Sequence, residues 1–100
     1  PTHSPGMKYR HYAPEARVQL IFDEALIPDK AAYLLSSTPM PNAKLFDRRN
    51  FYARLREADR KGISEITIYC AQNVQKDAGL MNRILRSAGK SEESFMEGSR

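Results

Sequence analysis

Two segments of the chain alternate apolar and polar residues with the two-residue period of a β-strand. The first, residues 17–22, reads RVQLIF, and Ile21 makes its second face partly apolar as well. We therefore expect a strand that is covered on both sides. The second, residues 63–70, reads ISEITIYC and is rich in β-branched residues, which favour strands. Its inward-facing positions are expected to be Ile66, Ile68 and Cys70.

A third apolar run, residues 31–37 (AAYLLSS), lies between Pro28 and Pro39. Pro28 could sit in the first turn of a short helix, but an apolar run of this length is equally typical of a buried strand. Residues 38–42 contain two prolines and are predicted to form a loop.

Two further segments have the period of a helix. Asp47 is a good N-cap residue for a helix over residues 48–61, and Gly62 follows as a stop. Asp77 caps a last helix that is ended by Gly89. The apolar stripe of the first helix consists of Phe51, Leu55 and Ala58, with Tyr52 alongside. The stripe of the last helix consists of Leu80, Ile84, Leu85 and Ala88.

The order of helices and strands predicts the α/β class, as a small Rossmann-like three-layer domain with a mostly parallel sheet. Only residues 23–30 separate the first two strands, whereas a parallel crossover needs about a dozen residues or more. These strands are therefore either antiparallel neighbours or joined across the sheet in a reduced form. We divide the chain into an extended linker (1–16), an α/β domain (17–89) and a polar tail without periodicity (90–100).

With 100 residues, 41% hydrophobic and 28% charged, the chain has the size and balance of one globular domain. No apolar run is long enough to span a bilayer, and no signal peptide opens the sequence. The single cysteine, Cys70, excludes an internal disulfide and favours a reducing compartment, so we expect a cytoplasmic protein without a membrane partner. The formal net charge of +4 is compatible with RNA binding, but no Lys/Arg block or aromatic ribonucleoprotein motif supports it.

The common catalytic and ligand-binding motifs are missing from the sequence. The five glycines are isolated from one another, which excludes a Walker A loop and a dinucleotide fingerprint. His3 and His11 have no nearby cysteines, so no metal site is predicted, and Cys70 is expected to be a small buried hydrophobe. Arg83 and Arg86 are either plain surface residues or contacts for a partner domain or RNA. The charges of the helix over 48–61 are expected to form a solvated, self-paired face: Arg54, Arg56, Arg60 and Lys61 with Glu57 and Asp59.

The segment over residues 4–14 (SPGMKYRHYAP) concentrates cations and aromatic rings between prolines. Prolines fix φ and bias the preceding residue toward extended conformations, so a short, semi-rigid strap is expected. Its two edges would carry alternating side chains, namely Lys8, Arg10 and Tyr12 on one edge and Tyr9 and His11 on the other. Two cations and a phenol on one edge suit a partner that carries phosphate. A solvated basic linker has equal standing from the residues alone.

This strap resembles the interdomain linker of the long, two-domain form of L-threonylcarbamoyladenylate synthase. In that family a YrdC-type catalytic domain precedes the linker and a smaller domain follows it. Residues 50–59 (NFYARLREAD) resemble a helix of the second domain, and residues 79–88 (GLMNRILRSA) resemble its closing helix. The resemblance favours a strand for residues 31–37, and it implies a helix between the first two strands that this chain lacks. A catalytic domain is then expected upstream of Pro1.

The resemblance implies an activity that belongs to the whole enzyme. ATP, L-threonine and bicarbonate are condensed to threonylcarbamoyl-adenylate and pyrophosphate, and the adenylate supplies the threonylcarbamoyl group for adenosine 37 of tRNA. The linker would fold over the nucleotide pocket of the catalytic domain as a lid. This chain alone is expected to be an inactive accessory or regulatory domain with no catalytic residue, no metal and no cofactor of its own. The parent enzyme would use ATP with Mg.

The resemblance also implies roles for the linker residues. Lys8 and Arg10 would pair with phosphate oxygens or hold the lid to acidic groups. Tyr9 or Tyr12 would hydrogen-bond or stack at the nucleotide, and spacing does not decide between them. His11 would orient the strap. The residues that set the geometry of the linker would be Ser4, Pro5, Gly6, Met7 and Pro14.

Two other functions remain open from the sequence. A freestanding small basic α/β module that binds tRNA or a protein partner would show salt-sensitive affinity for tRNA without any synthase. A small nucleotide sensor would bind ATP or AMP directly. Under the first hypothesis the expected partners are the YrdC-type domain and ATP or its adenylate, with tRNA left open as a further partner.

Overall fold

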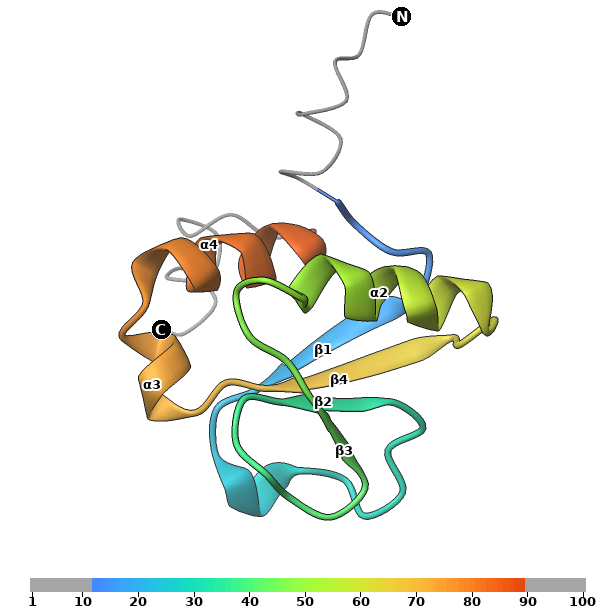
Figure 1. Ribbon diagram of the computed structural model, residues 1–100. Helices are drawn as coiled ribbons and strands as arrows, with labels where there is room; N and C mark the ends of the chain where they lie inside the picture. The colour runs from blue at the N-terminus through green and yellow to red at the C-terminus, as the bar shows by residue number, and fades with distance from the viewer. Residues whose placement is uncertain (1–11, 90–100) are drawn as a thin grey trace, which may run out of the picture.

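Four parallel strands form a single sheet in the order β1-β4-β2-β3 (Figure 1). The computed structural model describes residues 12–89. The expected α/β class and the parallel sheet are confirmed. In chain order the elements are β1 (Arg17–Ile21), the 3-10 turn η1 (Glu24–Leu26), β2 (Leu34–Ser36), β3 (Ala43–Leu45), α2 (Phe51–Arg60), β4 (Glu65–Tyr69), α3 (Gln72–Gln75) and α4 (Ala78–Ser87).

The last strand in the sequence, β4, is a central strand of the sheet, with β1 on one side and β2 on the other. Ile66, Ile68 and Cys70 are fully buried, as the alternation predicts. Thr67, whose side chain points to the opposite face, is also buried. A strand covered on both faces is typical of a parallel sheet, and the β-branched residues of β4 suit that position.

The connection between β1 and β2 settles the two alternatives for these strands. Both strands run parallel to β4 and lie on either side of it, so the chain is joined across the sheet. Residues 22–33 make this crossing, and η1 stands where the resemblance implies a helix. The ambiguous run over residues 31–37 is a strand, β2.

Sequence periodicity missed β3. Residues 37–42 are a loop, as expected for most of this range, and they return the chain to a parallel neighbour of β2. Six residues suffice because each strand is only three residues long, about 10 Å, and an extended six-residue link reaches about 20 Å. Asn42 turns the chain with φ 64°. A strand of three residues is too short to show a period.

The helices follow the predicted caps with one correction. The predicted helix over 48–61 begins only at Phe51, because Asp47 caps a turn before the helix rather than the helix itself. Its Oδ1 accepts hydrogen bonds from the backbone N–H groups of Arg49 (2.9 Å) and Asn50 (3.0 Å). Asp77 does cap α4, since its Oδ1 accepts from the Leu80 N–H at 3.1 Å. The two glycines predicted to end the helices have the positive φ of that position, Gly62 at 69° and Gly89 at 75°.

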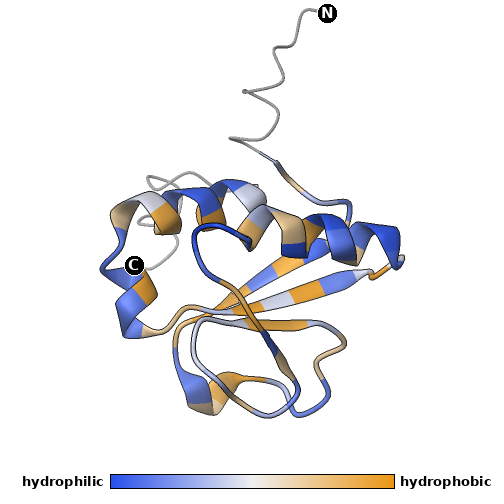
Figure 2. Cartoon of the chain, viewed as in Figure 1, coloured by the Kyte–Doolittle hydropathy of each residue, from blue (hydrophilic) through white to orange (hydrophobic). Residues whose placement is uncertain are grey.

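The two long helices lie on one side of the sheet and η1 on the other (Figure 1). The core fills the helical side, where buried side chains of α2 and α4 meet those of the strands. Apolar residues follow the strands and polar residues the outward turns of α2 (Figure 2). On the other face, Leu34 lines a small cavity together with residues of the segments around η1 and Met40. A loop layer therefore stands where a second helical layer would complete the three-layer arrangement.

Candidate functional site at the root of the arm

The described chain begins where the predicted strap joins the domain. The Tyr12 hydroxyl donates a hydrogen bond to Asp59 Oδ2, and the Glu15 backbone N–H donates to Asp59 Oδ1 at 3.0 Å. Ala16 is buried, and the Arg17 N–H donates to the Ser64 carbonyl at 2.9 Å. We call the contacts of Tyr12 and Glu15 with Asp59 the clasp. One carboxylate thus holds both a side chain and the backbone within residues 12–15. We call the predicted linker, residues 1–16, the arm.

Asp59 lies in the last turn of α2. A carboxylate near a helix C-terminus faces the negative end of the helix dipole, which costs about 0.3–1 kcal/mol. The two donors that the carboxylate accepts offset this cost. The prediction assigned Asp59 to a solvated, self-paired face and missed this role. The signal in the sequence was an acid at the end of a helix where a base is expected.

The phenol of the clasp stays protonated at neutral pH. Burial, then the hydrogen bond and the charge of Asp59, raise the pKa of Tyr12 to about 12, while Arg56 opposes the shift. The Tyr12 ring meets Tyr52 edge-on, with 6.3 Å between ring centroids and 73° between planes. Tyr12 is therefore a reliable donor to Asp59, held in place by an aromatic neighbour.

Three arginine side chains lie near the rings of Tyr12 and Tyr52. Burial raises the pKa of Tyr52, and the fields of Arg83 and Arg86 on α4 act against that shift. Arg86 Nε donates to Asn82 Oδ1 at 2.9 Å, and Arg83 Nη1 lies 3.5 Å from the Arg48 carbonyl oxygen. Neither guanidinium forms an ion pair with a carboxylate of residues 12–89. We call the surface formed by the following residues the arm-side face: Tyr12, Tyr52, Arg56, Arg83 and Arg86.

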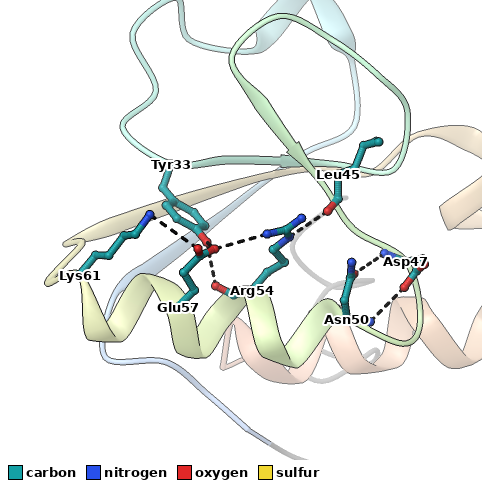
Figure 3. A network of polar contacts seen from close by, with 7 residues as sticks. All are labelled: Tyr33, Leu45, Asp47, Asn50, Arg54, Glu57 and Lys61. Atoms are coloured by element: carbon teal, nitrogen blue, oxygen red, sulfur yellow. Dashed lines mark hydrogen bonds and ion pairs between the residues drawn. The ribbon is translucent and has the colours of Figure 1, made fainter.

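A second polar cluster, centred on Glu57, joins α2 to the sheet (Figure 3). The Tyr33 hydroxyl lies 2.6 Å from Glu57 Oε1 and 3.0 Å from the Arg54 carbonyl oxygen. Arg54 and Lys61 form ion pairs with Glu57 at 3.5 and 3.6 Å. The Tyr33 hydrogen bond is the largest cause that lowers the pKa of Glu57; burial opposes the shift, and the positive charges around the carboxylate add to it. Because Arg54 Nε also donates to the Leu45 carbonyl at 2.9 Å, this cluster ties β2 and β3 to α2.

Other candidate sites within residues 12–89 offer little chemistry. A cavity of about 240 Å³ on the loop-covered face of the sheet is smaller than a usual ligand pocket. Cys70 is fully buried, as predicted, and burial raises the pKa of its thiol to about 12. No group of His, Cys, Asp or Glu in this part of the chain is arranged to hold a metal ion. Among the same residues, no helix has the length and apolar character needed to cross a membrane.

The structure brings together only part of the predicted site. Tyr12 and Pro14 are described, and Pro14 is half-buried between the clasp residues. The remaining predicted contacts and linker residues lie outside the described range: Ser4, Pro5, Gly6, Met7, Lys8, Tyr9, Arg10 and His11. The hydroxyl of Tyr12, one of the two tyrosines considered for the nucleotide, is hydrogen-bonded to Asp59.

A comparison with protein families decides the identity of the domain. The family model described as "Threonylcarbamoyl-AMP synthase, C-terminal domain" matches residues 1–89. The chain belongs to this family. Comparisons with curated proteins and with solved structures found no match.

Membership of the family confirms the resemblance over the strap and the domain together. The family has a role in threonylcarbamoyl-AMP synthase and thereby in the modification of tRNA. It also implies association with a catalytic YrdC-type domain in the parent enzyme.

Proposed function

We propose that this chain is the accessory C-terminal domain of a threonylcarbamoyl-AMP synthase, together with the linker that covers its active site. The parent enzyme would condense ATP, L-threonine and bicarbonate to threonylcarbamoyl-adenylate and pyrophosphate. The observation that carries this proposal is the clasp, because it fixes Tyr12, near the C-terminal end of the strap, to the domain. A lid has to be fixed at one end if its other end is to close on a target.

The lid has a clear chemical purpose. An acyl-adenylate is an activated mixed anhydride, and excluding water slows its hydrolysis while strengthening contacts between cations and phosphate. Lys8 and Arg10 would neutralise phosphate oxygens, and His11 would orient the strap between them and the clasp. Since Asp59 already engages Tyr12, we assign contact with the nucleotide to Tyr9 and assign Tyr12 to the root of the lid.

We assign the reaction itself to the catalytic domain. Residues 12–89 carry no arrangement of ligands for a metal ion, and the chain has no glycine-rich phosphate loop, so Mg and ATP would be held by the other domain. The chain alone would therefore be inactive. We place the enzyme in the cytoplasm, in agreement with the single, buried cysteine.

Adding the chain to a YrdC-type catalytic domain of this family tests the proposal. We expect the chain to slow the hydrolysis of threonylcarbamoyl-adenylate in the presence of ATP, L-threonine and bicarbonate. Lys8→Ala combined with Arg10→Ala should weaken this protection about tenfold, since each removes a charge-assisted contact with phosphate. Lys30→Ala combined with Lys76→Ala removes the same charge from exposed positions in the described domain and should change nothing. Equal protection with and without the two strap cations would refute the lid.

A further inference from the structure

We infer that the arm-side face is the surface of this domain that the catalytic domain contacts. The inference rests on the proposed function, because it starts from an arm that closes over a nucleotide held by that domain. The inference states, in addition, which face of the sheet is turned toward the active site of the catalytic domain. Three features of the molecule support this assignment: the anchor point of the arm, its reach, and the charges around its root.

The anchor point lies on the helical side. Tyr12 contacts Tyr52 and Asp59, both on α2, and the described chain begins on the side of α2 that faces away from the sheet (Figure 1). From there residues 13–16 run past the end of α2 and enter β1. The clasp therefore fixes Tyr12, which follows the cationic part of the arm in the sequence.

The reach of the arm from this point is short. Arg10 is two residues from Tyr12 and Lys8 is four, so their Cα atoms can lie at most about 7 and 14 Å away. The helical layer alone is about 10 Å thick. The sheet and the loop layer beyond it add roughly another 10 Å. Even with an extended side chain of about 7 Å, Arg10 cannot reach past both layers. A phosphate group that Arg10 shares with Lys8 therefore lies on the helical side, close to Tyr12.

The charges of the two faces agree with this placement. On the arm-side face, Arg83 and Arg86 on α4 have no carboxylate partner within residues 12–89, and the charge of Arg56 acts on Tyr12 from α2. The opposite face instead presents Glu24 and Asp29 at the small cavity. A partner surface that carries carboxylates and a bound nucleotide phosphate complements the first face and is repelled by the second.

An NMR titration locates the contact. The full 100-residue chain, labelled with ¹⁵N, is titrated with an unlabelled YrdC-type catalytic domain in the presence of ATP and L-threonine. We expect amide shifts along α4 and the outward turns of α2, and none over residues 24–31 or 40–45. Arg83→Glu combined with Arg86→Glu should raise the dissociation constant at least tenfold. The control, Lys30→Glu with Lys76→Glu, makes the same change of charge at exposed residues away from the arm-side face and should change it less than twofold.

The outcomes separate the inference from the proposed function. Shifts confined to residues 24–45, or an equal loss of affinity in the control, overturn the inference while the lid function stands. Absence of association, together with no effect of the chain on the hydrolysis of the adenylate, overturns the proposed function itself. A parallel titration with tRNA covers the remaining case. If the Arg83 and Arg86 variant weakens only a salt-sensitive affinity for tRNA, the face belongs to RNA and the inference is wrong.

Discussion

At the scale of single residues, Asp59 departs from the preference for basic residues at the C-terminus of a helix. Its carboxylate opposes the dipole of α2, and in a plain surface helix a basic residue would be preferred there. Departures of this kind are expected at functional or strained positions. Here the departure holds Tyr12 and the backbone of Glu15. The acid was visible in the sequence, but its partners are 44 and 47 residues away and no pattern along the chain connects them.

Replacing Asp59 should free the root of the arm. We expect Asp59→Ala to lower the free energy of unfolding by about 1 kcal/mol, because two hydrogen bonds to a partly exposed carboxylate are lost while its unfavourable interaction with the helix dipole is relieved. Hydrogen exchange of residues 12–17 should rise at the same time, while exchange in β4 stays unchanged. Asp29→Ala, which removes an exposed carboxylate from the opposite face, is the matched control. Unchanged exchange at residues 12–17 would show that the clasp does not hold the arm.

At the scale of elements, three of the four predicted helix ends and three of the four strands were found, whereas α3 and β3 were missed. Asp77, Gly62 and Gly89 act locally, through their own side chain or φ, so their effect can be seen in the sequence. The helix start predicted from Asp47 was wrong by about one turn. The Asp47 side chain caps the turn over residues 48–50, and the helix begins after that turn. The strand β3 forms by pairing with the edge of β2. This pairing leaves no pattern in the sequence of residues 43–45.

The cap of α4 can be separated from its ion pair. Asp77 accepts from the Leu80 N–H and also lies 3.4 Å from Nε of Arg48, whose side chain is 60% exposed. We expect Asp77→Ala to lower the free energy of unfolding by about 1 kcal/mol because the cap is lost. Asp77→Asn keeps an acceptor for the cap and removes only an exposed ion pair, so it should cost less than about 0.5 kcal/mol. Urea denaturation of both variants measures the difference, and equal losses would contradict the assignment to the cap.

At the scale of the whole molecule, the Glu57 cluster makes stability depend on pH. The folded state lowers the pKa of Glu57 below its ordinary value of 4.5. Its contribution to stability is therefore fully present above that value and is lost as the pH falls through the lower folded pKa. We expect urea midpoints to decrease below about pH 4.5. In Tyr33→Phe, which removes the largest cause of the shift, this decrease should be smaller. A pH dependence identical to that of the parent chain would exclude Glu57 as its source.

The order of strands was beyond prediction for a related reason. The sequence indicated a parallel α/β sheet, and it left two possibilities for the short connection after β1. What decides between them is that β4 occupies the position between β1 and β2. That outcome depends on burial across the whole domain, which is set by the packing of α2 and α4 and not by residues 23–30 themselves.

The interior place of β4 has a consequence for how the protein is made. Until residues 65–69 leave the ribosome, β1 has no neighbour, and only the short β2 and β3 can pair. Most of the nascent chain must therefore wait for a late segment before a stable nucleus can form, and such distant pairing slows folding. A catalytic domain synthesised ahead of this chain would already be complete by then. Under the function that we propose, the lid would gain its fixed end only after the catalytic domain has folded.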